Sequence, residues 1–189
     1  MASPALTVPG LARAGIIAAL YVVLTMAFLP VSFGIVQFRV SEVLMLLTAL
    51  VPGAVPGVTV GCFLANILGQ QGIVDIVGGT LATAIAALAT ARLARQIAAP
   101  RLLTSLQLRP PFDTRALGLF TLPLPTILAN GLIVGSYLPL LLLENPTIPA
   151  WLAAMGSVAL GEAFVLYVLG LPLLVLFGRL ARPHAGYAR

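Results

Sequence analysis

The chain has no lysine and few charged residues of any kind. Only 8% of its 189 residues are charged, 60% are hydrophobic, and the mean hydropathy is +1.11. Soluble domains carry about a quarter charged residues, so this composition excludes a water-soluble fold and predicts an integral membrane protein. The absence of lysine also excludes a P-loop ATPase, because the motif G-x-x-x-x-G-K-[ST] needs lysine to hold the nucleotide phosphates.

Cysteine and histidine are also scarce. Cys62 is the single cysteine and cannot close an intrachain disulfide, and the single histidine, His184, lies in the polar C-terminal tail. These residues leave no ligand set for zinc or haem, and no cofactor is expected. The net charge of +5 comes entirely from arginine on the basic side. We attribute it to the placement of the arginines along the chain rather than to a nucleic-acid partner.

Long apolar stretches fill most of the sequence, and a bilayer core requires about 20 apolar residues per helix. Residues 42–69 would form a helix about 42 Å long, but Pro52-Gly53 and Pro56-Gly57 interrupt it, which predicts two short helices that turn at those pairs. We therefore expect an all-α integral membrane protein with a single membrane domain, 1–189. Its six transmembrane helices, the second and third short, are expected at about 12–30, 42–51, 55–69, 75–97, 116–143 and 150–178.

The arginines predict the orientation. With the N-terminus in the cytoplasm, nine of the ten arginines lie inside and only Arg39 lies outside, as the positive-inside rule requires. Five spans with the N-terminus outside score equally, because Arg39 and Arg13 exchange sides. Helix length favours six spans, with both termini and a loop at 98–115 in the cytoplasm. The first helix has no small-x-small cleavage site before Pro30, so we expect it to be retained rather than removed as a signal peptide.

Two polar side chains are expected at the same depth in the bilayer. At 1.5 Å per residue, Glu162 lies about 18 Å from the outer end of the last span and Asn130 about 20 Å from that of the fifth. Two neighbouring antiparallel helices would bring this carboxylate and this carboxamide together. They are either the floor of a binding cavity or a structural contact between helices. The high cost of polar groups in lipid favours the cavity.

The fifth span carries a face of small residues and one aromatic ring. Asn130, Val134 and Tyr137 follow i, i+4, i+7 spacing and share this face, with Gly131 and Gly135 close by. We expect the glycines to pack closely on a neighbouring helix and the ring of Tyr137 to contact a ligand.

Acidic residues outnumber basic ones on the expected outer side. Glu42 and Asp75 are either first-turn acids that favour the helix dipole or site residues, and Glu144 also lies outside. Asn66 lies one turn from the outer end of its short helix and could face the same vestibule. With Arg39 as the one outer arginine, such a mouth would attract a flat, donor-bearing cation.

The first helix also carries small residues at i, i+4 spacing in two registers, Ala14 with Ala18 and Gly15 with Ala19. Such stripes let helices approach closely, but alanine-rich spans produce them by chance.

Several segments together resemble the QueT family. They are Val31-Ser32-Phe33-Gly34, Gln37-Phe38-Arg39-Val40-Ser41-Glu42, Gly61-Cys62 with Asn66, the segment 75–83, Asn130 with Val134-Gly135, Gly161-Glu162, and Leu169-Gly170-Leu171-Pro172-Leu173. The resemblance implies a substrate-binding S component of an energy-coupling factor transporter for queuosine precursors, located in a prokaryotic plasma membrane. It implies six helices, an outward-facing pocket and a partner module of one T component and two ATPases. It also implies that Ala14 and Ala18 dock the T component. The long loop from Pro100 to Arg115 departs from the family pattern.

The implied ligand, an aminomethyl deazaguanine or a related deazapurine, agrees with the charge pattern. Its flat ring has a guanine-like donor edge, which Glu162 can bind through two hydrogen bonds with Asn130 beside it. Glu42 or Asp75 would then neutralise the protonated amine.

Three residues complete the implied site. Gln37 and Tyr137 would line the ring, and Arg39 would form an ion pair with Glu42 that holds the first loop over the pocket. An S component for another vitamin-like ligand is an alternative. An intramembrane enzyme with Glu162 as general base is another, although such chemistry normally needs a second positioned group or a metal.

Overall fold

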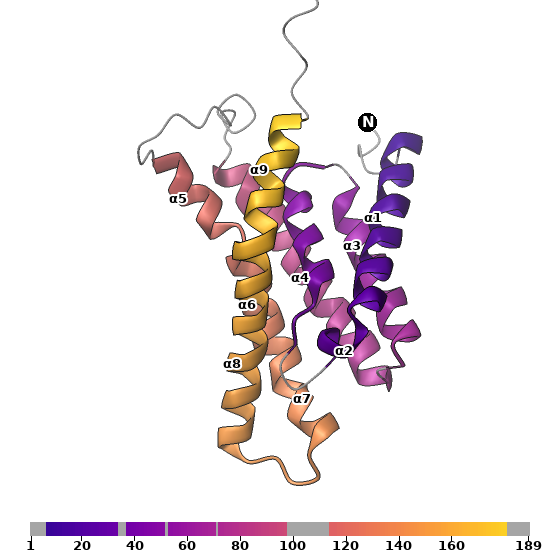
Figure 1. Cartoon of the computed structure of the whole chain (residues 1–189), viewed down its shortest axis with the longest axis vertical. Helices are drawn as coiled ribbons and strands as arrows, with labels where there is room; N and C mark the ends of the chain where they lie inside the picture. Colours follow the sequence, from indigo (N-terminus) through magenta and orange to yellow (C-terminus); the bar gives the residue numbers. More distant parts are fainter. Residues whose placement is uncertain (1–6, 34–36, 52, 71, 98–113, 181–189) are drawn as a thin grey trace, which may run out of the picture.

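The computed structural model describes residues 7–33, 37–51, 53–70, 72–97 and 114–180, and the regular structure in these ranges is entirely helical. The start of α1 (Val8–Ala27) and the end of α9 (Leu171–Leu180) lie at the same end of the bundle (Figure 1). The hairpin between α7 (Gly135–Leu142) and α8 (Ile148–Phe164) lies at the opposite end. The predicted loop at 98–115 falls almost wholly outside the described residues.

Four helical segments are long and apolar enough to cross a membrane: Val8–Ala27, Gly72–Ile97, Gly118–Leu142 and Ile148–Phe177. The segments Val40–Ala49 and Ala54–Leu68 are shorter apolar helices. The all-helical class and the two short helices are thus confirmed for the described residues, whereas the count of six crossings stays a prediction.

The two short helices are separated by a turn at Gly53, whereas the second Pro-Gly pair lies within the following helix. Gly53 has a φ of +94°, a left-handed conformation that glycine adopts without strain, and α3 (Ala54–Leu68) follows directly. Pro56 lies in the first turn of α3, where a missing N–H leaves no intrahelical bond unmade. The preceding short helix, η2 (Val40–Ala49), is a 3₁₀-helix rather than the α-helix expected at 42–51.

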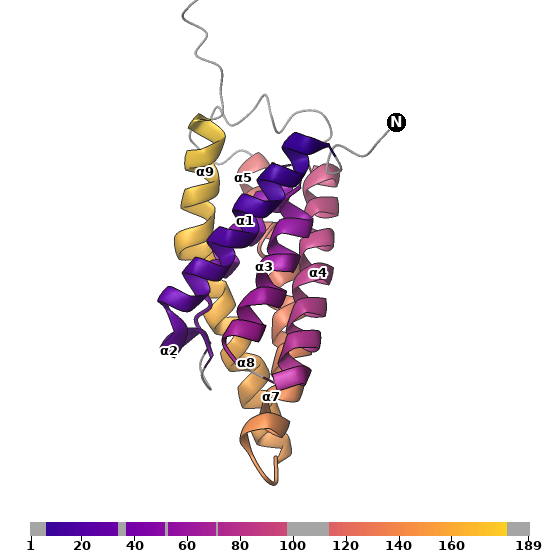
Figure 2. The same ribbon diagram turned by 90° about the vertical axis from the view of Figure 1, so that its right-hand side faces the viewer.

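Helices α1 and α3 pack through small residues and lie side by side in Figure 2. A Cβ added at Gly57 would lie 2.9 Å from the backbone oxygen of Ala14. One added at Gly61 would lie 2.6 Å from Cβ of Tyr21 and 3.1 Å from Cα of Ala18. The pair expected to dock a partner therefore contributes to an internal helix contact.

The other register of α1 faces outward. Gly15 and Ala19 are exposed, whereas Ala14 is half-buried and Ala18 is only 7% exposed. A partner that approaches α1 from outside would therefore meet Gly15 and Ala19 before Ala18.

Both C-terminal spans are interrupted by a π-helical turn. The fifth predicted span consists of α5 (Thr114–Thr121), α6 (Leu124–Ala129), η3 (Asn130–Val134) and α7. The last one continues from α8 through η4 (Val165–Gly170) into α9. A π-turn widens the helix locally and is frequent at functional sites. Asn130 opens η3, and Glu162 lies just before η4.

Candidate functional site

The segment that precedes η2 crosses α8 at a glycine. A Cβ added at Gly161 would lie only 2.0 Å from the backbone oxygen of Gln37, so no larger residue fits there without movement of the backbone. The next residue, Phe38, packs edge-on against Phe164 of α8 with ring centroids 5.7 Å apart. Gly161 therefore brings Gln37 and Arg39, both buried, beside Glu162.

Glu162 and Asn130 meet as predicted. The Asn130 amide nitrogen donates to Glu162 Oε1 at 2.8 Å, and both residues are buried. Glu162 Oε2 and the Asn130 carbonyl oxygen have no hydrogen-bond partner among the described residues. A purely structural contact would leave both acceptors desolvated, at a cost of about 1–3 kcal/mol each. The pair is therefore poised to accept hydrogen bonds from a third group.

Glu42 is fully buried and faces α1. The hydroxyl of Tyr21, which is also fully buried, donates to Glu42 Oε1, and Glu42 Oε2 has no partner among the described residues. Beside this contact, Thr25 Oγ1 of α1 donates to Ser41 Oγ at 2.7 Å. These two bonds join α1 to the first turn of η2.

Arg39 pairs with Asp75 rather than with Glu42, so the predicted Arg39–Glu42 ion pair is wrong. The closest guanidinium nitrogen lies 3.8 Å from Asp75 Oδ2, and the guanidinium also lies over the ring of Phe33, 5.0 Å from its centroid. Arg39 precedes the first turn of η2, whereas Glu42 lies within it. The two side chains consequently leave the chain toward different helices, α4 and α1.

Asp75 lies in the first turn of α4 (Gly72–Ile97), where the helix dipole favours an acid, and it is also part of the buried cluster. The Tyr137 hydroxyl donates to Asp75 Oδ1 at 2.6 Å, and the Asn66 amide donates to the Asp75 backbone oxygen at 3.0 Å. Gly79 leaves room for these groups, because a Cβ there would lie 2.9 Å from Asn66 Nδ2.

Three polar residues of this cluster, Tyr21, Cys62 and Thr83, were not predicted as site residues from the sequence. Tyr21 holds Glu42, and the buried thiol of Cys62 accepts from Thr83 Oγ1 at 3.2 Å and contacts Arg39 Nη1 at 3.9 Å. The phenol of Tyr21 inside an apolar span was the available signal, because a buried tyrosine hydroxyl usually has a hydrogen-bond partner. A threonine or cysteine in a span carries no comparable signal.

A cavity of about 180 Å³ opens onto this cluster. We call it the polar cavity, because three polar residues, Asp75, Gln37 and Gln70, line it. The rest of its lining is apolar: Phe33, Leu138, Leu141 and Leu142. Glu162, Asn130 and Glu42 do not belong to this lining, so the deeper acceptors are closed off in this conformation.

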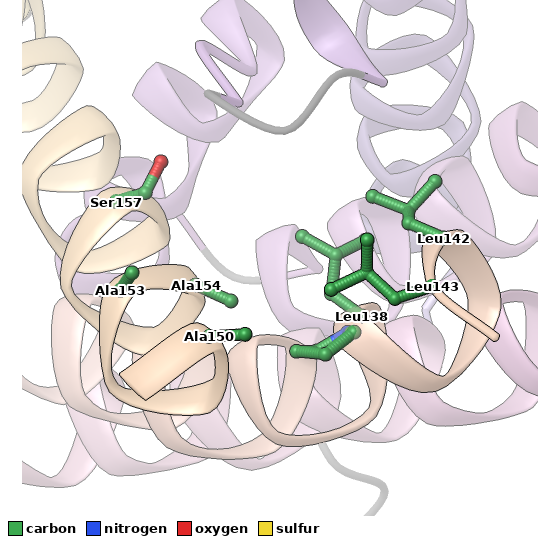
Figure 3. Close-up of a pocket in the computed structure, with 8 residues that line it drawn as sticks. Leu138, Leu142, Leu143, Ala150, Ala153, Ala154 and Ser157 are labelled. Atoms are coloured by element: carbon green, nitrogen blue, oxygen red, sulfur yellow. The ribbon is translucent and has the colours of Figure 1, made fainter. Parts of the chain in front are cut away.

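A second cavity, of about 280 Å³, lies between α7 and α8 (Figure 3). Its lining is apolar apart from Ser157, and it shares Leu138 and Leu142 with the polar cavity. These two leucines therefore form a wall between the two spaces.

The structure brings together all the residues predicted for ligand binding. They are buried, except for Tyr137, which is half-buried: Glu162, Asn130, Glu42, Asp75, Gln37, Asn66, Tyr137 and Arg39. The described residues contain no group of three or more histidine, cysteine or acidic side chains suited to a metal ion.

Comparison with known proteins places the chain in a family. The curated queuosine precursor transporter QueT of Lactococcus lactis subsp. cremoris (strain MG1363) is 42% identical to it over 66 residues, which are 34% of this chain and 39% of that protein. No solved structure gives a significant match. The profile of the QueT transporter family matches residues 11–179, and since this match extends over most of the chain, the protein belongs to the QueT transporter family.

Proposed function

We propose that this membrane protein is the substrate-binding S component of an energy-coupling factor transporter, and that it imports 7-aminomethyl-7-deazaguanine or a related deazapurine. The observation that carries the proposal is a set of buried acceptors without hydrogen-bond partners among the described residues. They are Glu162 Oε2, Asn130 Oδ1, Glu42 Oε2, Asp75 Oδ2 and Asn66 Oδ1. Arg39 Nε and Nη2 also lack a hydrogen-bond partner in the described part of the chain, but Arg39 pairs with Asp75, and the acceptors outnumber these donors. The set therefore suits a ligand that presents several donors and a positive charge.

The deeper acceptors suit the guanine-like edge of the ring. A carboxylate can accept two parallel hydrogen bonds, so Glu162 would accept from the ring N–H and the exocyclic amine. Asn130 would keep its bond to Glu162 and offer its carbonyl oxygen. Gln37 and Tyr137 would line the ring, and an acid, Glu42 or Asp75, would balance the amine.

Movement of the leucine wall would enlarge the polar cavity, whose lining does not include Glu162 in this structure. Leu138 and Leu142 border both cavities, and the apolar cavity offers space for their side chains. Pro139 lies between them in α7 and removes a backbone hydrogen bond, which makes this end of the helix easier to displace. We therefore assign ligand entry to the α7 side of the polar cavity.

Transport in this proposal depends on partners. A T component and two ATPases would supply the energy, because the chain has no lysine for a P-loop of its own. The T component would dock on the small-residue face of α1. Ala14 and Ala18 were expected there, and of the two registers of small residues it is Gly15 and Ala19 that are exposed. The protein would lie in a prokaryotic plasma membrane with both termini in the cytoplasm.

Ligand binding tests the assignment of the site. We expect the purified full chain to bind 7-aminomethyl-7-deazaguanine in preference to riboflavin, thiamin and biotin in a thermal-shift screen. Glu162→Gln should weaken this binding by about tenfold or more, because a hydrogen bond to a charged group contributes about 1.5–3 kcal/mol. Glu144→Gln, at an exposed position in the α7–α8 hairpin, is the matched control. Unchanged affinity in folded Glu162→Gln protein would remove Glu162 from the site.

An uptake assay tests whether transport depends on the ATPases. Cells that express the chain together with the T component and both ATPases should accumulate the labelled deazapurine, and cells that lack the ATPases should not. Uptake without the ATPases would reject the coupled mechanism and leave the binding assignment untouched.

A further inference from the structure

The two acids that could balance the ligand's amine have different surroundings. Asp75 already faces the guanidinium of Arg39 at 3.8 Å and accepts a hydrogen bond from Tyr137 at 2.6 Å. Glu42 accepts from the neutral hydroxyl of Tyr21, and its other oxygen has no partner among the described residues. We propose that Glu42 is the residue that selects a cationic ligand, and that it gives up a proton when the ammonium group binds.

The balance of buried charge supports this assignment, which rests on the proposed function. The described cluster holds three carboxyl groups, Glu42, Asp75 and Glu162, against the single guanidinium of Arg39. An isolated buried carboxylate is so costly that it takes up a proton instead. Since Arg39 compensates Asp75, the remaining negative charge falls on Glu42 and Glu162.

Glu42 and Glu162 belong to the same buried cluster, since the segment that leads into η2 packs at Gln37 against Gly161, the residue before Glu162. Asn130 donates to Glu162 at 2.8 Å, and neither acid has an ion-pair partner among the described residues. Two buried carboxylates of one cluster without a compensating cation do not both ionise readily. In the absence of ligand, at least one proton is therefore held by this pair.

The other ionisable groups around Glu42 supply no second cation. Those that lie around it on the neighbouring elements are Tyr21 of α1, Arg39, Cys62 of α3 and Glu162 of α8. The acid of α4, Asp75, faces Arg39 instead. In η4 and the described side chains of α9, which also contact η2, the ionisable residue is Tyr167, whose hydroxyl donates to the Phe120 backbone oxygen at 2.8 Å.

The exchange conserves charge within the site. The ligand enters as R–NH₃⁺, the O–H bond of the Glu42 carboxyl group breaks, and the proton leaves to the solvent. Glu42 Oε2 then accepts from the ammonium group while Oε1 keeps the bond from Tyr21. Glu162 stays free to bind the ring edge. One proton is released for each cationic ligand bound, and a neutral ligand of the same shape releases none.

Calorimetry on the full chain in detergent micelles tests this exchange. The probes are 7-aminomethyl-7-deazaguanine and the uncharged 7-cyano analogue of the same ring. Each is titrated at several pH values, and at each pH in phosphate and in Tris buffer, whose ionisation enthalpies differ. We expect the aminomethyl probe to release about one proton per molecule bound and its affinity to rise about tenfold per pH unit while Glu42 is protonated. The cyano probe should show neither effect.

Two variants distinguish the acids. Glu42→Gln keeps an acceptor for Tyr21 but has no proton to release, so it should lose the proton release and the preference for the aminomethyl probe and still bind the cyano probe. Glu144→Gln, which removes an exposed acid outside the cluster, should keep the proton release. The opposite pattern in the two variants would overturn the assignment to Glu42.

Failure of the proton exchange can be distinguished from failure of the proposed function. Binding of the aminomethyl probe with the same heat in both buffers would overturn the exchange and leave the proposed function standing. No binding of either probe would overturn the proposed function and this inference together. Should Glu42→Gln fail to fold, the two-buffer titration of the unaltered protein decides the question alone.

Discussion

Gly161 positions the predicted binding site, because its lack of a side chain lets the backbone at Gln37 pack against α8. We expect Gly161→Ala to destabilise the protein by about 1–3 kcal/mol, the usual range for overpacking, because its Cβ would lie 2.0 Å from the Gln37 backbone oxygen. The displaced segment carries Arg39, so ligand affinity should also fall. Thermal unfolding and a binding titration in the same detergent measure both effects.

Gly156→Ala is the control for this substitution. Gly156 lies in the same helix, α8, and a Cβ there would meet nothing within 4 Å. Alanine favours helix by up to about 1 kcal/mol over glycine, so Gly156→Ala should leave the unfolding temperature equal or higher. Equal stability of the two variants would show that the segment at Gln37 is not fixed against α8.

Tyr21 is a positioning residue for Glu42. Tyr21→Phe keeps the buried ring and removes the hydroxyl that donates to Glu42 Oε1. A hydrogen bond to a charged group is worth about 1.5–3 kcal/mol, so affinity for the aminomethyl probe should fall by about tenfold, with little change for the cyano probe. A merely structural loss would weaken both probes alike. Tyr167→Phe is the control, because its hydroxyl bonds the Phe120 backbone oxygen away from the cluster.

At the scale of elements, regular helices were predictable from the sequence and irregular ones were not. The contact between Asn130 and Glu162 followed from counting residues along two spans, since the α-helical rise is nearly constant. The partner of Arg39 did not follow. It depends on the direction in which a short 3₁₀-helix and the segment before it send their side chains, and spacing alone does not fix that direction.

The two Pro-Gly pairs predicted a turn, but tertiary contacts decide where the turn forms. Pro52-Gly53 and Pro56-Gly57 are the same dipeptide, yet of the two glycines only Gly53 takes a positive φ. Gly57 packs in a helix against Ala14 instead. The choice depends on the tertiary contact with α1, which a local pattern does not contain. The two π-turns likewise had no signal in the residues that form them.

The outer face of α1 provides the prediction for partner binding. Gly15→Leu should leave ligand affinity unchanged, because a Cβ at this exposed glycine meets nothing within 4 Å. Docking through small residues requires close helix approach, so the leucine should strongly reduce ATP-dependent uptake and co-purification of the T component. Gly156→Leu adds the same bulk to α8 at a half-buried glycine, where a Cβ also meets nothing within 4 Å. Equal uptake by the two variants would place the docking face elsewhere.

At the scale of the whole molecule, one helix, α1, takes part both in the small-residue contact with α3 and in the polar cluster around Glu42. Helix α1 packs on α3 through Ala14 and Ala18 and reaches Glu42 through Tyr21. A partner that moves α1 therefore also moves a hydrogen-bond donor of the predicted binding site. In the proposed transporter, partner docking and ligand release would therefore both act on α1.

The sides of the membrane on which Val8 and Glu144 lie distinguish six spans from five. The start of α1 and the α7–α8 hairpin lie at opposite ends of the bundle (Figure 1). Val8 belongs to the first and Glu144 to the second, and both residues are exposed. Six spans place Val8 inside and Glu144 outside, whereas five spans with an outer N-terminus place both outside. Cys62, the single cysteine of the sequence, is fully buried and should not react, so cysteines introduced by Val8→Cys and Glu144→Cys can be labelled separately in intact cells. An impermeant maleimide should label only the cysteine at 144, and the one at 8 should react only after the membrane is opened. Labelling of both in intact cells would reject the six-span arrangement and, with it, a T component that docks on α1 from the cytoplasmic end.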